Sequence, residues 1–344
     1  MHIHGGNIYK NKVKADFSAN LNLLGMPESV QKAAIEGVLA SQVYPDPDCT
    51  LLREKLALLH QIPMDQILCG NGAAELIFAL AAEVKPQKAL IVAPSFFEYT
   101  QALNYVHCEI TEYFLTKEHQ FCIQEDFLDW IKPELDLVFL CNPNNPTGQL
   151  IDPILLEKIV TKATKMNCLC VIDECFLSFV DEKDQYSCSS LIKNNSICIL
   201  KAFTKIYAMP GIRLGYLIAS DQKLLSNMKN GIQPWSVSVV AQKAGVAALD
   251  EVEYLNETLN QLKSEKDFLL EQLHLLDYEV YGSAANFIFF KGETNLFQQL
   301  LSEGIMIRDC SNFSGLEQGY FRIAVRTRQE NCLLIETIRR IRHG

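Results

Sequence analysis

The chain has 344 residues, of which 49% are hydrophobic and 21% charged, a composition typical of a globular protein with one large core or two unequal ones. Its formal net charge of -10 and pI near 5.3, with no cluster of lysine and arginine, argue against nucleic-acid binding. No apolar run reaches the roughly 18 residues that span a bilayer, and residues 1–14 lack the apolar segment of a secretory signal. We therefore expect a cytoplasmic protein with no membrane or nucleic-acid partner.

Two polar clusters of small residues open the chain, His4-Gly5-Gly6-Asn7 and Asp16-Phe17-Ser18-Ala19-Asn20. Because they show little periodicity, they predict an ordered arm. Helices are predicted after Pro27 and from Thr50, where apolar residues recur at helical spacing. Between them, closely spaced prolines exclude helix and place Tyr44 on a stiff loop. Taken alone, a loop tyrosine is more often a surface residue than a ligand contact.

A glycine-rich turn, Gly-Asn-Gly-Ala-Ala-Glu at residues 70–75, precedes an apolar helix predicted over residues 76–84. Such a turn leaves free backbone N–H groups at the start of the helix, which favours an anion. The turn matches neither the dinucleotide-binding nor the P-loop pattern. It therefore indicates either a phosphate site or simply the start of a helix.

Strands and helices then alternate. Strands are predicted over residues 89–93, 110–114, 135–141, 169–173, 196–200 and 214–219, and helices over residues 97–105, 125–131 and 153–166. This alternation, with nearly continuous apolar strands, is typical of an α/β fold with a mainly parallel sheet covered on both faces. Ligands bind such sheets at the carboxyl ends of the strands, so we expect the site in the loops at residues 70–74, 94–96, 142–148 and 173–176.

The pattern changes after residue 235. Long helices are predicted over residues 239–248 and 252–276, followed by strands at 285–290, 305–308 and 320–325 and helices at 296–303 and 329–342. These elements indicate a smaller α+β domain. We expect three parts: an N-terminal arm and first helix (1–40) that pack with the small domain and the active site, a large ligand-binding domain (41–230), and a small C-terminal domain (231–344).

The chain contains twelve cysteines, and several of them lie in apolar runs, where cysteine acts as a small hydrophobic residue. No C-x-x-C pair occurs, so the sequence predicts free thiols and no metal site.

Lys205 follows the strand predicted at residues 196–200 and precedes the one at 214–219, on what we expect to be an irregular turn. Burial there disfavours the ammonium form, and a neutral amine can condense with an aldehyde. The Thr204 hydroxyl and the Arg213 guanidinium suit a nearby phosphate. An aldehyde and a phosphate together indicate pyridoxal phosphate. Taken alone, Lys205 and Arg213 are more often solvated loop residues.

Two further polar side chains follow buried strands. The loop at residues 142–148 is rich in asparagine, proline and glycine, a rigid combination that presents Asn145 to a ligand. Asp173 ends the strand predicted at residues 169–173. A buried aspartate needs a cationic partner, which a protonated pyridine nitrogen would supply, although Asp173 could instead cap a local turn.

Together these motifs resemble the fold-type I pyridoxal-phosphate enzymes of the aspartate aminotransferase superfamily. The residues that match are Asn145-Pro146-Thr147-Gly148, Asp173-Glu174, Thr204-Lys205 and Arg213. The resemblance implies that Lys205 binds the cofactor covalently, that Asp173 pairs with its pyridine nitrogen and that Asn145 contacts its ring hydroxyl. It also implies that Phe96 stacks on the cofactor ring. The cofactor phosphate would be bound by Gly72, Ala73, Ala74, Thr204 and Arg213. In a homodimer, Tyr44 would reach the cofactor phosphate of the neighbouring subunit.

A finer resemblance is to the histidinol-phosphate aminotransferase branch and, inside it, to the threonine-phosphate decarboxylases of cobalamin synthesis. It is carried by the two N-terminal clusters and by residues 308–313 and 320–323. It implies that the substrate is bound by His4, Gly5, Asn20, Asn145, Arg308 and Arg322. Two arginines suit a substrate that carries both a carboxylate and a phosphate.

The activity implied by this resemblance is decarboxylation of L-threonine O-3-phosphate, or of O-phosphoserine, to the amino alcohol phosphate that provides the aminopropanol linker of cobalamin. Histidinol-phosphate transamination and a non-catalytic ligand-binding protein of the same fold are the alternatives. Three positions depart from the expected pattern: Phe176 replaces a tyrosine, Ala202 replaces a hydroxyl residue for which Thr204 can substitute, and Leu23 replaces a proline.

Overall fold

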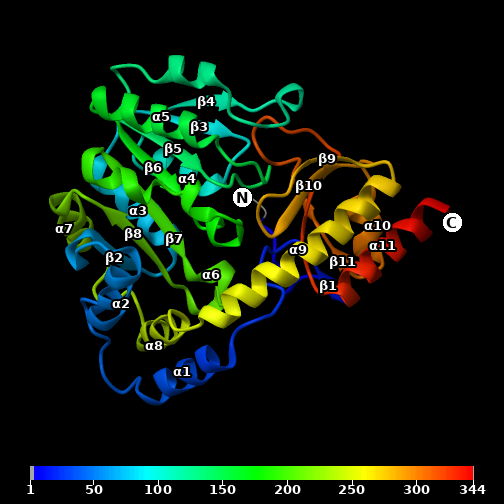
Figure 1. Ribbon diagram of the computed structural model, residues 1–344, viewed down its shortest axis with the longest axis horizontal. Helices are drawn as coiled ribbons and strands as arrows, with labels where there is room; N and C mark the ends of the chain where they lie inside the picture. The colour runs from blue at the N-terminus through cyan, green and yellow to red at the C-terminus, as the bar shows by residue number, and fades with distance from the viewer. Residues whose placement is uncertain (1–3, 344) are drawn as a thin grey trace.

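The protein is described over residues 4–343 by a computed structural model, in which the strands form sheets of seven, four and two members (Figure 1). The large sheet has the order β2-β8-β7-β6-β5-β3-β4. Its strands are β2 (Ile67–Gly70), β3 (Lys88–Ala93), β4 (Glu109–Phe114), β5 (Leu137–Cys141), β6 (Leu169–Asp173), β7 (Ile197–Ala202) and β8 (Gly215–Ala219). Only β8 runs antiparallel to its neighbours. The predicted α/β fold with a mainly parallel sheet is confirmed.

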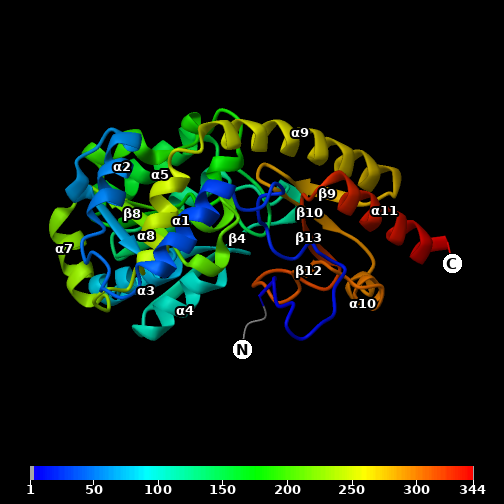
Figure 2. The same cartoon turned by 90° about the horizontal axis from the view of Figure 1, so that it is seen from below.

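Helices cover both faces of this sheet (Figure 2). One face carries α3 (Ala73–Val84), α4 (Phe97–Tyr105) and α7 (Gln222–Gly231), and the other carries α2 (Thr50–His60) and α5 (Pro153–Lys165). Successive residues of a strand point to opposite faces of the sheet. In β6, Val171 packs in the core under α3 and α4, whereas Cys170 and Ile172 pack in the core under α5. This alternation explains why the central strands are apolar at nearly every position.

A four-stranded antiparallel sheet lies beyond the large one, in the order β12-β13-β10-β9. Its strands are β9 (Glu279–Gly282), β10 (Phe287–Lys291), β12 (Arg308–Asp309) and β13 (Tyr320–Ala324), with α9 (Val252–Leu275), α10 (Leu296–Ser302) and α11 (Arg328–His343) beside them. The register places Arg308 directly opposite Arg322. Because cross-strand partners share a face of the sheet, both arginines project to the same side.

The N-terminal segment joins the smaller sheet. β1 (Ala15–Asp16) pairs in parallel with β11 (Ile305–Met306). The next residue, Phe17, donates its backbone N–H to Met306 O and accepts a hydrogen bond from the Ala324 N–H. Farther along, α1 (Glu28–Leu39) packs against α8 (Val239–Ala248), which also contacts α2. The division of the chain near residues 230 and 231 stays a prediction.

Several predicted elements differ from those in the structure. The helix after the glycine-rich turn begins at Ala73, three residues earlier than predicted, because Gly72 directly precedes its first turn. Lys205 lies in a one-turn helix, α6 (Phe203–Ile206), and not on an irregular turn. Residues Glu125–Trp130 form a 3-10 helix. The short strand β9 and helix α7 are absent from the prediction.

All twelve cysteines are free thiols. Among residues 4–343, no helix is long and apolar enough to cross a membrane.

Candidate active site

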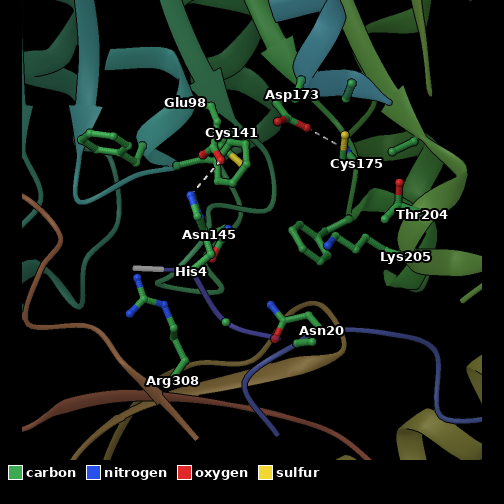
Figure 3. Close-up of a pocket in the computed structure, with 18 of the residues that line it drawn as sticks. His4, Asn20, Glu98, Cys141, Asn145, Asp173, Cys175, Thr204, Lys205 and Arg308 are labelled. Atoms are coloured by element: carbon green, nitrogen blue, oxygen red, sulfur yellow. Dashed lines mark hydrogen bonds and ion pairs between the residues drawn. The ribbon is translucent and has the colours of Figure 1, made fainter. Parts of the chain in front are cut away.

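A pocket lies at the carboxyl ends of β5, β6 and β7, where the N-terminal arm and the smaller sheet approach the large sheet (Figure 3). It is lined by every residue predicted for the site except Gly72 and Tyr44. Gly72 directly precedes Ala73 and Ala74, the first two residues of α3, and both of these line the pocket. Tyr44 lies outside the pocket of its own chain, is 75% exposed and stacks on Trp235 with ring centroids 4.3 Å apart.

Lys205 reaches the pocket from α6. Its Nζ lies 5.9 Å from the centroid of the Phe176 ring. Burial, and the positive charges of Arg322 and Arg213, lower the pKa of Lys205 to about 8, so a substantial fraction of the amine is neutral near physiological pH. Such an amine can act as a nucleophile.

The short helix that carries Lys205 is held by Asn22 from the N-terminal segment. The Asn22 backbone N–H donates to Lys205 O over 3.1 Å, and its Nδ2 donates to Ile206 O over 2.7 Å and to Thr258 Oγ1 over 2.8 Å. Asn22 is fully enclosed at 2% exposure. These bonds explain how a helix of one turn keeps a fixed position.

Asp173 ends β6 and points into the pocket, with two donors that fix its carboxylate. The Tyr99 hydroxyl donates to Oδ2 over 2.6 Å, and the Cys175 backbone N–H donates to Oδ1 over 2.9 Å. Tyr99 itself is buried and stacks on Phe139 at 4.8 Å. A carboxylate in this setting can pair with a cationic group of a ligand.

The start of α3 and Arg213 form an anion-binding corner. Gly72 has φ of +81°, and a Cβ atom there would lie 2.7 Å from Arg213 Nη2. The first N–H groups of α3, at Ala73 and Ala74, have no intrahelical acceptor. Thr204 lines the same pocket with its side chain 7% exposed. Helix N–H groups, a hydroxyl and a guanidinium together suit a phosphate.

The asparagine-rich loop is held by its own side chains. Asn144 Nδ2 donates to Pro94 O over 3.0 Å and to Thr147 Oγ1 over 2.9 Å, and Gly148 N–H donates to Asn144 O over 2.7 Å. Asn145 is thereby presented to the pocket, where its Oδ1 accepts a hydrogen bond from Arg322.

The opposed arginines of β12 and β13 are both 6% exposed. Arg322 Nη2 donates to Ser18 O over 2.8 Å, and Arg308 Nη2 donates to Asn312 Oδ1 over 2.8 Å. Burial, together with the neighbouring charge of Arg308, lowers the pKa of Arg322 to about 10. Among the described residues, no carboxylate forms an ion pair with either arginine. Two buried cations that form no ion pair with any of these residues favour an anionic ligand.

The N-terminal arm borders the same pocket. Gly6 N–H donates to Ser18 Oγ over 2.7 Å, and a Cβ at Gly5 would lie only 2.1 Å from Ser18 O, so only glycine permits this approach. Asn20 is 2% exposed, and within residues 4–343 neither its Oδ1 nor its Nδ2 has a hydrogen-bond partner. His4 Nε2 lies 3.5 Å from Glu98 Oε1.

Several residues of the site were not predicted from the sequence, among them Asn22, Glu98, Tyr99 and Cys175. Glu98 and Tyr99 share the first turns of α4, directly after the loop that carries Phe96. The sequence did offer one indication that Glu98 and Tyr99 belong to the site, because their helix follows the carboxyl end of a predicted strand. Asn22 offered no such signal, because its partners lie 184 and 236 residues away.

Comparison with known families gives a match over residues 12–338 to the aminotransferase class I and II family. The threonine-phosphate decarboxylase of Salmonella typhimurium is 37% identical, over 99% of this chain and 97% of that protein. Among solved structures, the histidinol-phosphate aminotransferase of Clostridium acetobutylicum has a TM-score of 0.88 at 29% identity, covering 95% of this chain and 98% of that one. The L-threonine-O-3-phosphate decarboxylase of Porphyromonas gingivalis has a TM-score of 0.83 at 25% identity, covering 95% and 99%.

Proposed function

The chain belongs to the aminotransferase class I and II family and is a pyridoxal-phosphate-dependent enzyme, and we propose that it decarboxylates L-threonine O-3-phosphate or O-phosphoserine. The products are carbon dioxide and the amino alcohol phosphate. From L-threonine O-3-phosphate this is aminopropanol phosphate, which would provide the aminopropanol linker of cobalamin. The observation that carries this proposal is the 37% identity, over 99% of the chain, to a threonine-phosphate decarboxylase.

The residues of the pocket fit pyridoxal phosphate. Lys205 offers a buried amine with a depressed pKa, Asp173 a carboxylate for the pyridine nitrogen, and Arg213 with the start of α3 a corner for the phosphate. In the proposal Phe96 contacts the ring and Asn145 its hydroxyl, while Thr204 bonds the phosphate. When bound, the cofactor supplies an electron sink for the pair left at Cα after bond cleavage.

The opposed arginines are proposed to hold the two anionic groups of the substrate, one the carboxylate and the other the phosphate. His4, Gly5 and Asn20 border the substrate from the arm, and the two unpartnered polar atoms of Asn20 are available to it. The chemistry depends on which Cα bond these residues turn across the cofactor ring. Lys205 is placed to return a proton to Cα after carbon dioxide has left.

Histidinol-phosphate transamination is the second candidate. It is favoured by the TM-score of 0.88 to a histidinol-phosphate aminotransferase. Such an enzyme would use the arginines for the phosphate of histidinol phosphate and for the carboxylates of 2-oxoglutarate. It would place the Cα–H bond across the ring and remove a proton with Lys205. The two activities therefore differ in how the substrate is oriented in one pocket.

The deciding experiment supplies holoenzyme with each phosphate ester, and separately with histidinol phosphate plus 2-oxoglutarate, while carbon dioxide and glutamate are measured. We expect carbon dioxide from the phosphate esters and little glutamate. Unphosphorylated threonine and serine should be poor substrates, because a buried arginine left unpaired costs about 1–3 kcal/mol or more. Glutamate without carbon dioxide would establish the second candidate, and no turnover of any of these compounds would contradict both candidates.

We also propose a homodimer with shared active sites. Large apolar side chains are exposed along α1 and the loop that follows it: Ile35, Val38, Leu39, Val43 and Tyr44. Exposed apolar side chains gathered on one element mark an interaction surface, and a second copy of the chain is the occupant we propose. Tyr44, which lies outside its own pocket, would then reach the cofactor phosphate of the partner.

A further inference from the structure

Glu98 is an acidic residue in a pocket proposed to receive a substrate with two anionic groups. It lies in the first turn of α4 and lines the same pocket as Lys205 and both arginines. Its side chain is 15% exposed, and within residues 4–343 no donor reaches its Oε2 atom. Figure 3 shows Glu98, His4 and Arg308 grouped on the side of the pocket away from Lys205 and Thr204.

Charged and titratable groups face Glu98 from four elements. His4 of the N-terminal arm lies 3.5 Å from its Oε1, and Asp173 of β6, Lys205 of α6 and Arg308 of β12 act on it through the pocket. Arg308 directs its guanidinium to Asp309 O and Asn312 Oδ1 and forms no ion pair with Glu98. Burial dominates over these charges and raises the pKa of Glu98 to about 7.

Of these two side chains, Glu98 is the one whose pKa is raised, so it holds a proton more readily than His4 does. Burial, Arg308 and Lys205 all lower the pKa of His4 below its ordinary value of 6.5, whereas the pKa of Glu98 is raised to about 7. An incoming anion adds negative charge next to Glu98 and stabilises its protonated form further. A protonated carboxyl group is a hydrogen-bond donor, but an ionised one only accepts.

We propose that Glu98 recognises the substrate as a neutral acid, donating a hydrogen bond from its carboxyl group to the anionic ester group while Arg308 holds that group's charge. Above neutral pH, binding then takes one proton from solvent onto the Glu98 carboxylate. The inference rests on the proposed function only in that the ligand carries an anionic ester. It holds whether that ligand is decarboxylated or transaminated.

The test uses 3-(sulfooxy)butanoate, which carries a carboxylate and a sulfate ester but no amine to react. A sulfate ester keeps one charge above pH 6, whereas a phosphate ester titrates near pH 6 and would mask the effect. Calorimetry of the holoenzyme in buffers of different ionisation enthalpy measures both affinity and proton uptake. For the wild type we expect uptake approaching one proton per site at pH 8, and affinity roughly 25-fold weaker at pH 8.5 than at pH 6.5.

The direction in which affinity changes with pH follows from the coupling of ligand binding to protonation of Glu98. The binding form is protonated, so affinity is full below pH 7 and is lost as pH rises through the pKa of free Glu98. Glu98→Gln, whose amide donates at every pH, should bind with nearly constant affinity and take up no proton. Glu98→Asp, which keeps an acid, should retain uptake. Glu109→Gln, an exposed position on β4, should behave as wild type.

Cofactor absorbance and circular dichroism establish that each variant is folded and loaded. Wild-type proton uptake that persists in Glu98→Gln would overturn the proposal, as would uptake that disappears in His4→Phe, because the proton would then belong to His4. Failure of the sulfate ester to bind at any pH would also overturn it. Glutamate formation in place of carbon dioxide would instead refute the decarboxylase proposal and leave the role of Glu98 standing.

Discussion

The pocket holds its carboxylate and its lysine in different ways. Asp173 receives hydrogen bonds from Tyr99 and Cys175, which fix the position of its carboxylate. Among residues 4–343, no carboxylate forms an ion pair with Lys205, and burial lowers the pKa of this lysine to about 8. The pocket thus combines a fixed carboxylate with an amine that loses its proton more easily than an ordinary lysine, an arrangement that suits the proposed cofactor.

The depressed pKa of Lys205 predicts how cofactor capture depends on pH. Because only the neutral amine condenses with an aldehyde, the rate at which apoenzyme binds added pyridoxal phosphate should rise with pH and level off above about pH 8. Stopped-flow absorbance measures this rate, and borohydride should fix the cofactor on Lys205. A rate that still climbs steeply at pH 10 would show an ordinary lysine. Lys205→Ala should lose the adduct, whereas the exposed control Lys223→Ala should keep it.

Tyr99→Phe tests the support of Asp173. The change removes only the hydroxyl and leaves a buried carboxylate oxygen without its donor, which costs about 1–3 kcal/mol. We expect weaker cofactor binding by roughly 5- to 100-fold and a shifted pH titration of the cofactor absorbance. Tyr105→Phe on the same helix, 71% exposed, is the matched control. Equal behaviour of the two variants would contradict a role for the Tyr99 hydroxyl.

At the residue scale, the sequence could predict the groups that sit on local motifs. Lys205, Asp173 and Asn145 each follow a buried strand, and the carboxyl end of a strand in an α/β sheet is where ligand contacts gather. Tyr99 could not be found in this way, because its hydrogen bond to Asp173 joins residues 74 positions apart. Its sequence environment is that of an ordinary core aromatic residue.

At the scale of elements, the junction of β2 and α3 shows why glycine is needed. Gly72 occupies positive φ directly before α3, and Gly215 of β8 lets the start of α3 approach, since a Cβ there would lie 2.5 Å from Ala73 N. The predicted helix began three residues late because Ala73 and Ala74 precede its apolar period. Strand positions were predicted closely because continuous apolar runs mark them, whereas one-turn α6 depends on tertiary contacts from Asn22.

Gly72→Ala should weaken the anion-binding corner. A side chain at φ of +81° and ψ of 161° lies in a backbone region essentially restricted to glycine and costs about 1–3 kcal/mol, and the new Cβ would also displace the Arg213 guanidinium. The dissociation constant of pyridoxal phosphate, measured by fluorescence titration of apoenzyme, should increase roughly 5- to 150-fold. Gly231→Ala, where no atom lies within 4 Å of the added Cβ, should have the wild-type value. An unchanged constant in Gly72→Ala would place the phosphate elsewhere.

At the scale of the whole molecule, the pocket is assembled from distant parts of the chain. The arm supplies Asn20, the short helix α6 after β7 supplies Lys205, and the smaller sheet supplies Arg308 and Arg322. The mainly parallel sheet and an α+β C-terminal region could be predicted from the order of the elements. The opposition of the two arginines could not, because it depends on the register of β12 against β13.

The proposed sharing of active sites between two subunits predicts that two inactive variants can restore each other's activity. Lys205→Ala and Tyr44→Ala homodimers should each have low activity, the first without its amine and the second without the partner's phosphate contact. In a mixed dimer, the subunit with Tyr44→Ala keeps its Lys205 and receives Tyr44 from its partner, so one of the two sites is complete. Random exchange should therefore restore about a quarter of the wild-type activity.

The activity of the mixture is measured after subunit exchange, and light scattering shows whether dimers are present. Lys205→Ala mixed with Asp173→Ala is the control, because both of these residues line the pocket of their own chain and a mixed dimer then contains no complete site. Its activity should stay at the level of the parent variants. Restoration in both mixtures, or in neither while the dimers exchange, would contradict a tyrosine donated across the interface. A monomer in solution would refute the shared site outright.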